Sequence, residues 1–210
     1  MSALPKASSA CARRRRRLSP LAGDIMLAQG DGGALTPAAW IALAALAHLL
    51  MRPAELGVFL LPSAALFSAL CLIALFDAAY FVIPDGPIWF LAAIGLATIL
   101  SADPAETPYR LAAAAAGYSS LRLVAWGYEK WRGTAGVGQG DAKLYALAGL
   151  WLGFRGLPSC MVVAVLSALL AVVVAMRAGR IENAREPIPF GPHLTLGIWL
   201  VWAVDPLEIG

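Results

Sequence analysis

Long apolar runs, each closed by proline, glycine or charged residues, follow one another along most of this chain and constrain its fold more than any other feature. Of the 210 residues, 60% are hydrophobic and 14% are charged. A soluble domain carries about 25% charged residues, and a helix needs roughly 20 apolar residues to cross a bilayer. The runs therefore predict an all-α fold, a polytopic bundle of membrane helices.

Seven runs are candidate transmembrane helices, so we expect a bundle of about six to seven helices. They cover residues 37–51, 56–76, 87–100, 111–126, 142–154, 158–176 and 190–204, and the first and fifth are short for a span. Prolines stand at most of the boundaries, as expected where helices start or stop. We expect residues 37–210 to form one membrane domain.

The N-terminal segment, residues 1–36, has a different composition. It contains a run of arginines, Arg13 to Arg17, and no apolar stretch long enough for the core of a signal peptide. We expect a disordered basic cytosolic tail, with a true start at Met26 as the alternative. Because no aromatic residues interleave the arginines, they favour a topology signal over a nucleic-acid site, and no nucleic acid is expected as a partner.

Charges on the predicted loops are distributed unevenly. With the N-terminus in the cytoplasm, most of the 16 Lys and Arg residues fall on the cytoplasmic side, while Arg52, Arg110 and Arg155 fall outside. This bias is what the positive-inside rule predicts. It puts two segments, FDAAYFVIPDG (76–86) and GVGQGDAK (136–143), at the cytoplasmic face.

Each of these segments carries an aspartate at the end of an apolar run: Asp77 closes one run and Asp141 opens another. An ionisable group at membrane depth is a functional candidate by default. Two carboxylates that meet on one face share a proton, so one can act as general base on water while the other acts as general acid. The pair predicts an aspartic protease. A non-catalytic membrane scaffold and a proton-coupled transporter, using the same acids, are the alternatives.

The glycines before Asp141 predict an open approach to it. Gly136, Gly138 and Gly140 permit backbone conformations closed to other residues, and they leave room for a peptide beside the carboxylate. Structural alternatives exist for the polar positions: an ordinary turn at Pro84 and Asp85, a helix N-cap at Asp141, and a headgroup anchor at Lys143.

Cysteine and histidine give no sign of a metal site. Cys11, Cys71 and Cys160 stand far apart and form no CxxC pattern, which argues against zinc and against a disulfide framework. His48 and His193 are too few and too separate for a metal centre. We therefore expect neither a metal nor a cofactor.

Three motifs together resemble a known family. FDAAYFVIPDG and GVGQGDAKLYALAGLWLG are similar to the two aspartate motifs of the type IV prepilin peptidases, membrane aspartic proteases whose second motif is GxGD. The resemblance implies that Asp77 and Asp141, 64 residues apart, are the catalytic pair. IPFGPHLTLG, residues 188–197, is similar to a third family signature. The supporting positions that the three motifs imply are Pro84, Asp85, Gly136, Gly138, Gly140, Lys143, Pro189, Gly191 and Pro192.

The resemblance also implies a substrate and a location. Such enzymes remove the leader peptide of type IV prepilins or type II secretion pseudopilins at the cytoplasmic face of the bacterial inner membrane, after a glycine and before an apolar helix. The expected partners are these substrates and the lipid bilayer. The basic leader of a substrate would meet cytosolic acids, and the candidates are Asp85, Glu129, Glu182 and Glu186.

Two features depart from the family pattern. Larger members carry an N-terminal cytosolic domain with paired CxxC motifs, associated with methylation of the new N-terminus. The tail here has one cysteine, so we expect the short form, without a methyltransferase domain or zinc. His193 stands where an apolar residue is common in the family.

Overall fold

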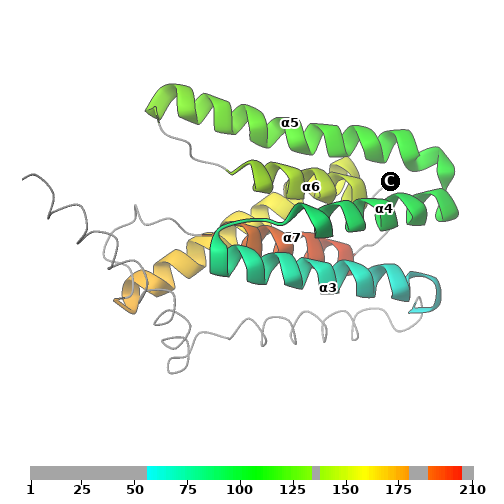
Figure 1. Cartoon of the computed structure of the whole chain (residues 1–210), viewed down its shortest axis with the longest axis horizontal. Helices are drawn as coiled ribbons and strands as arrows, with labels where there is room; N and C mark the ends of the chain where they lie inside the picture. The colour runs from blue at the N-terminus through cyan, green and yellow to red at the C-terminus, as the bar shows by residue number, and fades with distance from the viewer. Residues whose placement is uncertain (1–55, 134–137, 180–188, 205–210) are drawn as a thin grey trace, which may run out of the picture. The chain divides into compact units, whose positions relative to one another are not determined.

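The described part of the chain is helical throughout (Figure 1). The computed structural model describes residues 56–133, 138–179 and 189–204, with side chains from residue 61 onward. Within these ranges the elements are α3 (Leu56–Tyr80), α4 (Asp85–Ala102), a 3₁₀ turn η2 (Pro104–Glu106), α5 (Thr107–Arg132), α6 (Gln139–Arg177) and α7 (Gly191–Val204). The predicted all-α class is confirmed.

The helices coincide with the predicted runs but extend beyond them. α3 continues past the predicted end at Phe76 and includes Asp77, and α4 begins at Asp85 instead of residue 87. α5 adds polar residues at both ends of the predicted run 111–126. The predicted helix 37–51 and the tail 1–36 lie outside the described residues, so the division between tail and membrane domain stays a prediction.

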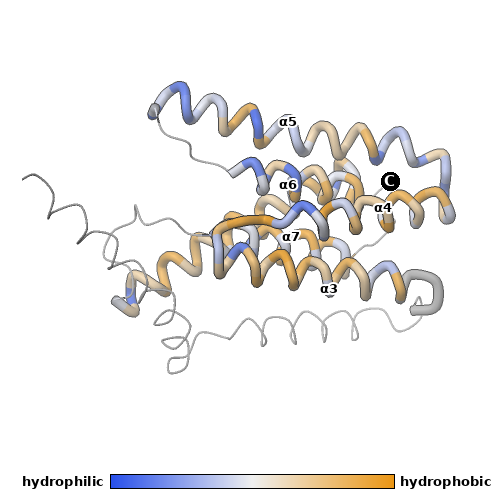
Figure 2. Tube along the Cα trace, in the orientation of Figure 1, coloured by the Kyte–Doolittle hydropathy of each residue, from blue (hydrophilic) through white to orange (hydrophobic). Residues whose placement is uncertain are grey.

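Three of the described helices are long and apolar enough to cross a membrane. They are α3 from Leu61 onward, α4 and α6, while α7 is apolar but shorter. α5 is not among the three because it carries charged residues along its length; Figure 2 shows hydrophilic stretches along α5 and at the start of α6, beside long apolar stretches of α3 and α4. The described residues thus supply three candidate spans toward the six to seven predicted for the whole chain.

α6 reverses direction at Gly153, so one helical element contains the two predicted helices 142–154 and 158–176. The backbone leaves the helical conformation there, with φ 68° and ψ −173°. The Tyr145 hydroxyl donates a hydrogen bond of 2.8 Å to the Leu157 carbonyl, although twelve residues along a straight helix would span about 18 Å. The segment after Gly153 therefore folds back along the segment before it (Figure 1).

A buried arginine holds this reversal. Arg110, assigned from the sequence to an outer loop, lies instead in the first turn of α5 and is only 2% exposed. Its Nη1 donates a hydrogen bond of 2.9 Å to the carbonyl of Trp151, and its Nε lies 3.6 Å from Glu106 Oε2. The last carbonyls of a helical segment lack intrahelical donors. Arg110 supplies a hydrogen-bond donor to such a carbonyl, that of Trp151, just before the break at Gly153.

Small residues let the helices approach closely. A Cβ atom on Gly117 would lie 2.6 Å from the Tyr145 carbonyl oxygen, and one on Gly149 would collide with the Ala113 carbonyl. Gly117 and Ala113, within the small-residue stretch 112–117, therefore allow close packing of α5 against α6. α5 therefore packs along α6, whose first turn carries Asp141.

Candidate active site

Asp77 lies in the last turn of α3 and is buried, with 6% of its surface exposed. The backbone N–H of Gly191, the first residue of α7, donates a hydrogen bond of 2.8 Å to Asp77 Oδ2. The first N–H groups of a helix have no intrahelical acceptor, and the helix dipole makes that end favourable for a carboxylate. The start of α7 therefore provides both a donor and a favourable field for Asp77.

The contact between Gly191 and Asp77 leaves no room for a side chain. A Cβ atom on Gly191 would lie 2.6 Å from Asp77 Oδ2 and 2.8 Å from its Cγ. Pro192, the next residue, occupies an early helical position where the missing N–H removes no helical bond. With Pro189 just before the helix, this segment brings bare backbone against the carboxylate.

Asp141 lies in the first turn of α6 and is partly buried. The N-cap position is occupied by Gly138, so the alternative in which Asp141 is itself the N-cap is wrong. The backbone of Gly138 lies beside its carboxylate. A Cβ atom on Gly138 would lie 3.2 Å from Asp141 Oδ2.

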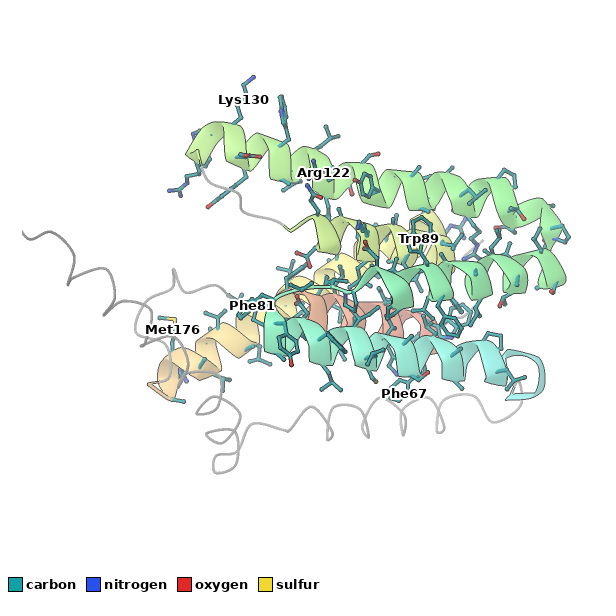
Figure 3. The ribbon with its side chains drawn as sticks, in the orientation of Figure 1. Phe67, Phe81, Trp89, Arg122, Lys130 and Met176 are labelled. Atoms are coloured by element: carbon teal, nitrogen blue, oxygen red, sulfur yellow. The ribbon has the colours of Figure 1, made fainter. Side chains whose placement is uncertain are left out.

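The two aspartates come together from opposite directions of the chain. Asp77 ends α3 and Asp141 begins α6, and their carboxylates are close enough to interact electrostatically. The start of α7 touches the same place through Gly191. Figure 3 shows this end of α3, where Phe81 is labelled. Three helix ends thus converge on the two carboxylates.

The glycines beside Asp141 let neighbouring atoms come close to the backbone. Neither Gly138 nor Gly140 has a backbone conformation that other residues avoid. Gly138 has φ −67° and ψ 149°, a conformation open to any residue. A Cβ atom on Gly140 would lie 2.9 Å from Ile83 Cβ. The expected open approach is therefore wrong for Gly140, because Ile83 from the segment between α3 and α4 fills the space there. At Gly138 the expectation stays a prediction. Gly136 lies outside the described residues.

Phe81 follows the end of α3, four residues after Asp77, in a conformation that bulky residues rarely adopt. Its φ is 55°, and its N–H donates a hydrogen bond of 2.9 Å to the Asp77 carbonyl. A left-handed position for such a residue costs about 1–3 kcal/mol, and strain of this kind gathers at functional sites. The turn it makes directs the chain through Ile83 and Pro84 toward α4.

Lys143 and Asp85 form an ion pair that the sequence did not predict. Lys143 Nζ lies 2.6 Å from Asp85 Oδ1, and the two side chains are 42% and 56% exposed. Asp85 is the first residue of α4 and not part of an ordinary turn, and Pro84 is the N-cap. The pair links the start of α4 to the start of α6, two residues after Asp141. The only available signal was the opposite charge of residues beside the two aspartate motifs.

This ion pair affects the expectation that Asp85 would contact the basic leader of a substrate. Asp85, a candidate for contact with a basic leader, is already paired with Lys143. Glu129 is exposed on α5, and Glu182 and Glu186 lie outside the described residues. In the three described ranges, no group of three His, Cys, Asp or Glu side chains comes together as a metal site requires.

Comparison with known proteins identifies the family of this chain. The sequence model of the type IV leader peptidase family matches residues 64–176, a range that includes both aspartates. The chain belongs to the type IV leader peptidase family. It is therefore a member of a family of peptidases.

Relatives of the type IV leader peptidase family are similar over most of the described residues. A protein named prepilin leader peptidase/N-methyltransferase from Pectobacterium carotovorum subsp. carotovorum is 35% identical over 147 residues, 67% of this chain and 52% of the relative. The protein of the same name from Dickeya chrysanthemi is 33% identical over 151 residues, 72% and 52% of the two chains. The chain thus spans about half the length of these relatives. No solved structure matches it significantly.

Proposed function

We propose that this protein is a membrane aspartic endopeptidase in which Asp77 and Asp141 activate water. Its substrates are type IV prepilins or type II secretion pseudopilins, whose leader peptide it removes at the cytoplasmic face of the bacterial inner membrane. The observation that carries the proposal is the meeting of two carboxylates from the ends of α3 and α6, in a chain of a peptidase family.

In this mechanism the two carboxylates share one proton. The ionised aspartate takes a proton from water as the water oxygen attacks the scissile carbonyl carbon, and the protonated aspartate donates to the carbonyl oxygen. Collapse of the tetrahedral intermediate breaks the C–N bond, and the leaving amine takes a proton from the pair. The Gly191 N–H holds Asp77 Oδ2, which leaves Oδ1 for the shared proton.

The supporting motif residues act on geometry in this proposal. Gly191 gives α7 close access to Asp77, and Gly140 gives Ile83 close access to α6. Asp85 and Lys143 tie the starts of α4 and α6 together. Four of the remaining positions lie at helix starts: Pro84, Gly138, Pro189 and Pro192. Gly136 belongs to the second aspartate motif.

The distribution of charge supports a cytoplasmic site. The last turn of α5 carries Lys130 and Arg132, and the last turn of α6 carries Arg177. Because α6 reverses at Gly153, both of these ends lie on the same side as Asp141. Asp103 follows α4 at the opposite end. Lys130, Arg132, Lys143 and Arg177 lie at the site end, against Arg110 and Arg155 at the other end, and an excess of Lys and Arg on the cytoplasmic side is what the positive-inside rule predicts.

A direct test compares cleavage by wild type, Asp77→Asn and Asp141→Asn in proteoliposomes. The substrate is a synthetic peptide with a basic leader ending in glycine, followed by an apolar helix. Both variants keep the side-chain shape, and we expect each to lose activity about 100-fold or more because neither can complete the proton exchange. Cleavage at the wild-type rate by either variant would favour the alternatives, a membrane scaffold or a proton-coupled transporter using the same acids.

A further inference from the structure

The first turn of α7 is held on two sides. On one side Gly191 bonds to Asp77 of α3. His193 follows two residues later, about 200° further around the helix, and its Nδ1 lies 3.1 Å from Ser167 Oγ on the second segment of α6. The α7 turn that touches the carboxylate therefore has a polar contact to α6 on its far side.

The hydrogen-bond pattern is satisfied in full by one tautomer. Ser167 Oγ also lies 3.0 Å from the carbonyl oxygen of Ala164, which can only accept. A hydroxyl has one proton to give. We assign the Nδ1–H tautomer to the neutral ring, because His193 then donates to the Ser167 oxygen while the hydroxyl donates to the carbonyl.

Packing and a distant hydrogen bond also hold α7. A Cβ atom on Gly197 would lie 2.5 Å from the Cys160 carbonyl oxygen, so α7 and α6 are in backbone contact. Farther along α7, Trp202 Nε1 donates a hydrogen bond of 3.0 Å to Ser63 Oγ of α3. The bond from His193 to Ser167 is directional, and it lies within one turn of Gly191.

We propose that His193 is a positioning residue: its bond to Ser167 sets the rotation and height of the α7 start, and so keeps the Gly191 N–H on Asp77. The effect on turnover rests on the proposed function. The tolerance is small, because a shift of about 1 Å would break a hydrogen bond of 2.8 Å. Displacement of a catalytic group by about 1 Å can lower the rate about 100-fold.

The first experiment measures cleavage of the synthetic leader–helix peptide in proteoliposomes. We expect His193→Leu and Ser167→Ala to lower kcat about 10-fold or more, with KM changed less than about twofold. His193→Asn should retain most of the activity, since its amide can donate from near the Nδ1 position, whereas His193→Gln should not. The double variant His193→Leu/Ser167→Ala should be no slower than the slower single variant.

A matched control tests for a general effect of losing a helical serine. Ser120 makes the same bond to the carbonyl three residues earlier, on α5. Ser120→Ala should leave kcat unchanged. Equal losses in His193→Leu and His193→Asn, or wild-type kcat in His193→Leu, would overturn the positioning role.

The second experiment does not depend on cleavage. Amide hydrogen exchange of residues 189–197 should be about 10-fold faster in His193→Leu than in wild type, and near wild type in His193→Asn. Unchanged exchange in His193→Leu would overturn the inference. If wild type fails to cleave the peptide, the proposed function fails and hydrogen exchange alone decides the role of His193. If wild type cleaves it and Asp77→Asn does not, the proposed function stands whichever way His193 is decided.

Discussion

The N–H of Gly191 lies 2.8 Å from Asp77 Oδ2, a bond between residues 114 positions apart in the chain. We expect Gly191→Ala to abolish cleavage, since the new methyl group would sit 2.6 Å from that oxygen and push α7 away. Overpacking of this kind costs about 1–3 kcal/mol of stability. Cleavage of the synthetic leader–helix peptide and thermal unfolding in detergent are the measurements.

Gly127 provides the control for that substitution. It lies in α5, and a Cβ atom there would meet nothing within 4 Å. Gly127→Ala should keep full activity and gain up to about 1 kcal/mol of stability, because alanine favours the helix. An active Gly191→Ala enzyme would mean that the contact is not needed for catalysis.

The reversal of α6 should be sensitive at Gly153. Gly153 and Gly133 have nearly the same positive φ, 68° and 70°, but only Gly153 has neighbours that a methyl group would crowd, with Tyr109 Cε1 at 3.2 Å. Alanine costs about 1–2 kcal/mol in the left-handed conformation of Gly133, with ψ 9°, whereas the conformation of Gly153, with ψ −173°, is essentially restricted to glycine. Gly153→Ala should therefore lower the unfolding temperature more than Gly133→Ala, and equal shifts would show that the break tolerates a side chain.

Arg110 should stabilise the same reversal. Arg110→Met keeps most of the side-chain volume but leaves the Trp151 carbonyl without the donor that lies 2.9 Å away. Loss of one partner of a buried hydrogen bond costs about 1–3 kcal/mol. The unfolding temperature measures this loss of stability. The control is Arg122→Met, the same substitution on α5 at a residue outside this contact. An unchanged unfolding temperature in Arg110→Met would contradict the capping role.

The ion pair between Lys143 and Asp85 should make a small contribution. Both side chains are substantially exposed, so a double-mutant cycle with Lys143→Gln and Asp85→Asn should give a coupling of about 0.2–1 kcal/mol that weakens in high salt. A coupling of zero would mean that the contact has no energetic role. Wild-type cleavage by both single variants would remove the pair from the supporting positions of the site.

Membrane sidedness can be tested by cysteine labelling. Glu129 and Ala105 are exposed near opposite ends of α5. In whole cells, a maleimide that cannot cross the inner membrane should label Ala105→Cys and leave Glu129→Cys unlabelled until the membrane is opened. The wild-type protein gives the background from its own cysteines. The reverse pattern would put the two aspartates on the outer face.

The sequence predicted the described helices and marked Asp77 and Asp141 as candidate functional residues, because both signals are local. Apolar runs of the right length determine where helices form, and an aspartate at the end of a run is visible without any knowledge of packing. The helix ends were less well predicted: α3 runs past Asp77, and the turn after it depends on Phe81 with φ 55°. No pattern of residues indicates a bulky side chain in that conformation.

Contacts between distant segments were not predictable in the same way. Nothing near Gly191 in the sequence indicates that Asp77 lies against it, and nothing near Arg110 indicates Trp151. The role of the glycines was misjudged for the same reason. At Gly140 a side chain would collide with Ile83, which comes from another part of the chain. The sequence does not distinguish a glycine that avoids such a collision from one that makes the backbone flexible.

The break at Gly153 also determines the end of the helix bundle to which α6 returns. A straight α6 of 39 residues would be about 58 Å long and would end far from Asp141. With the break, the second segment runs back along the first and ends on the side from which α6 started (Figure 1). A single glycine far from both carboxylates thus decides whether Asp141 and Gly191 can belong to one site at all.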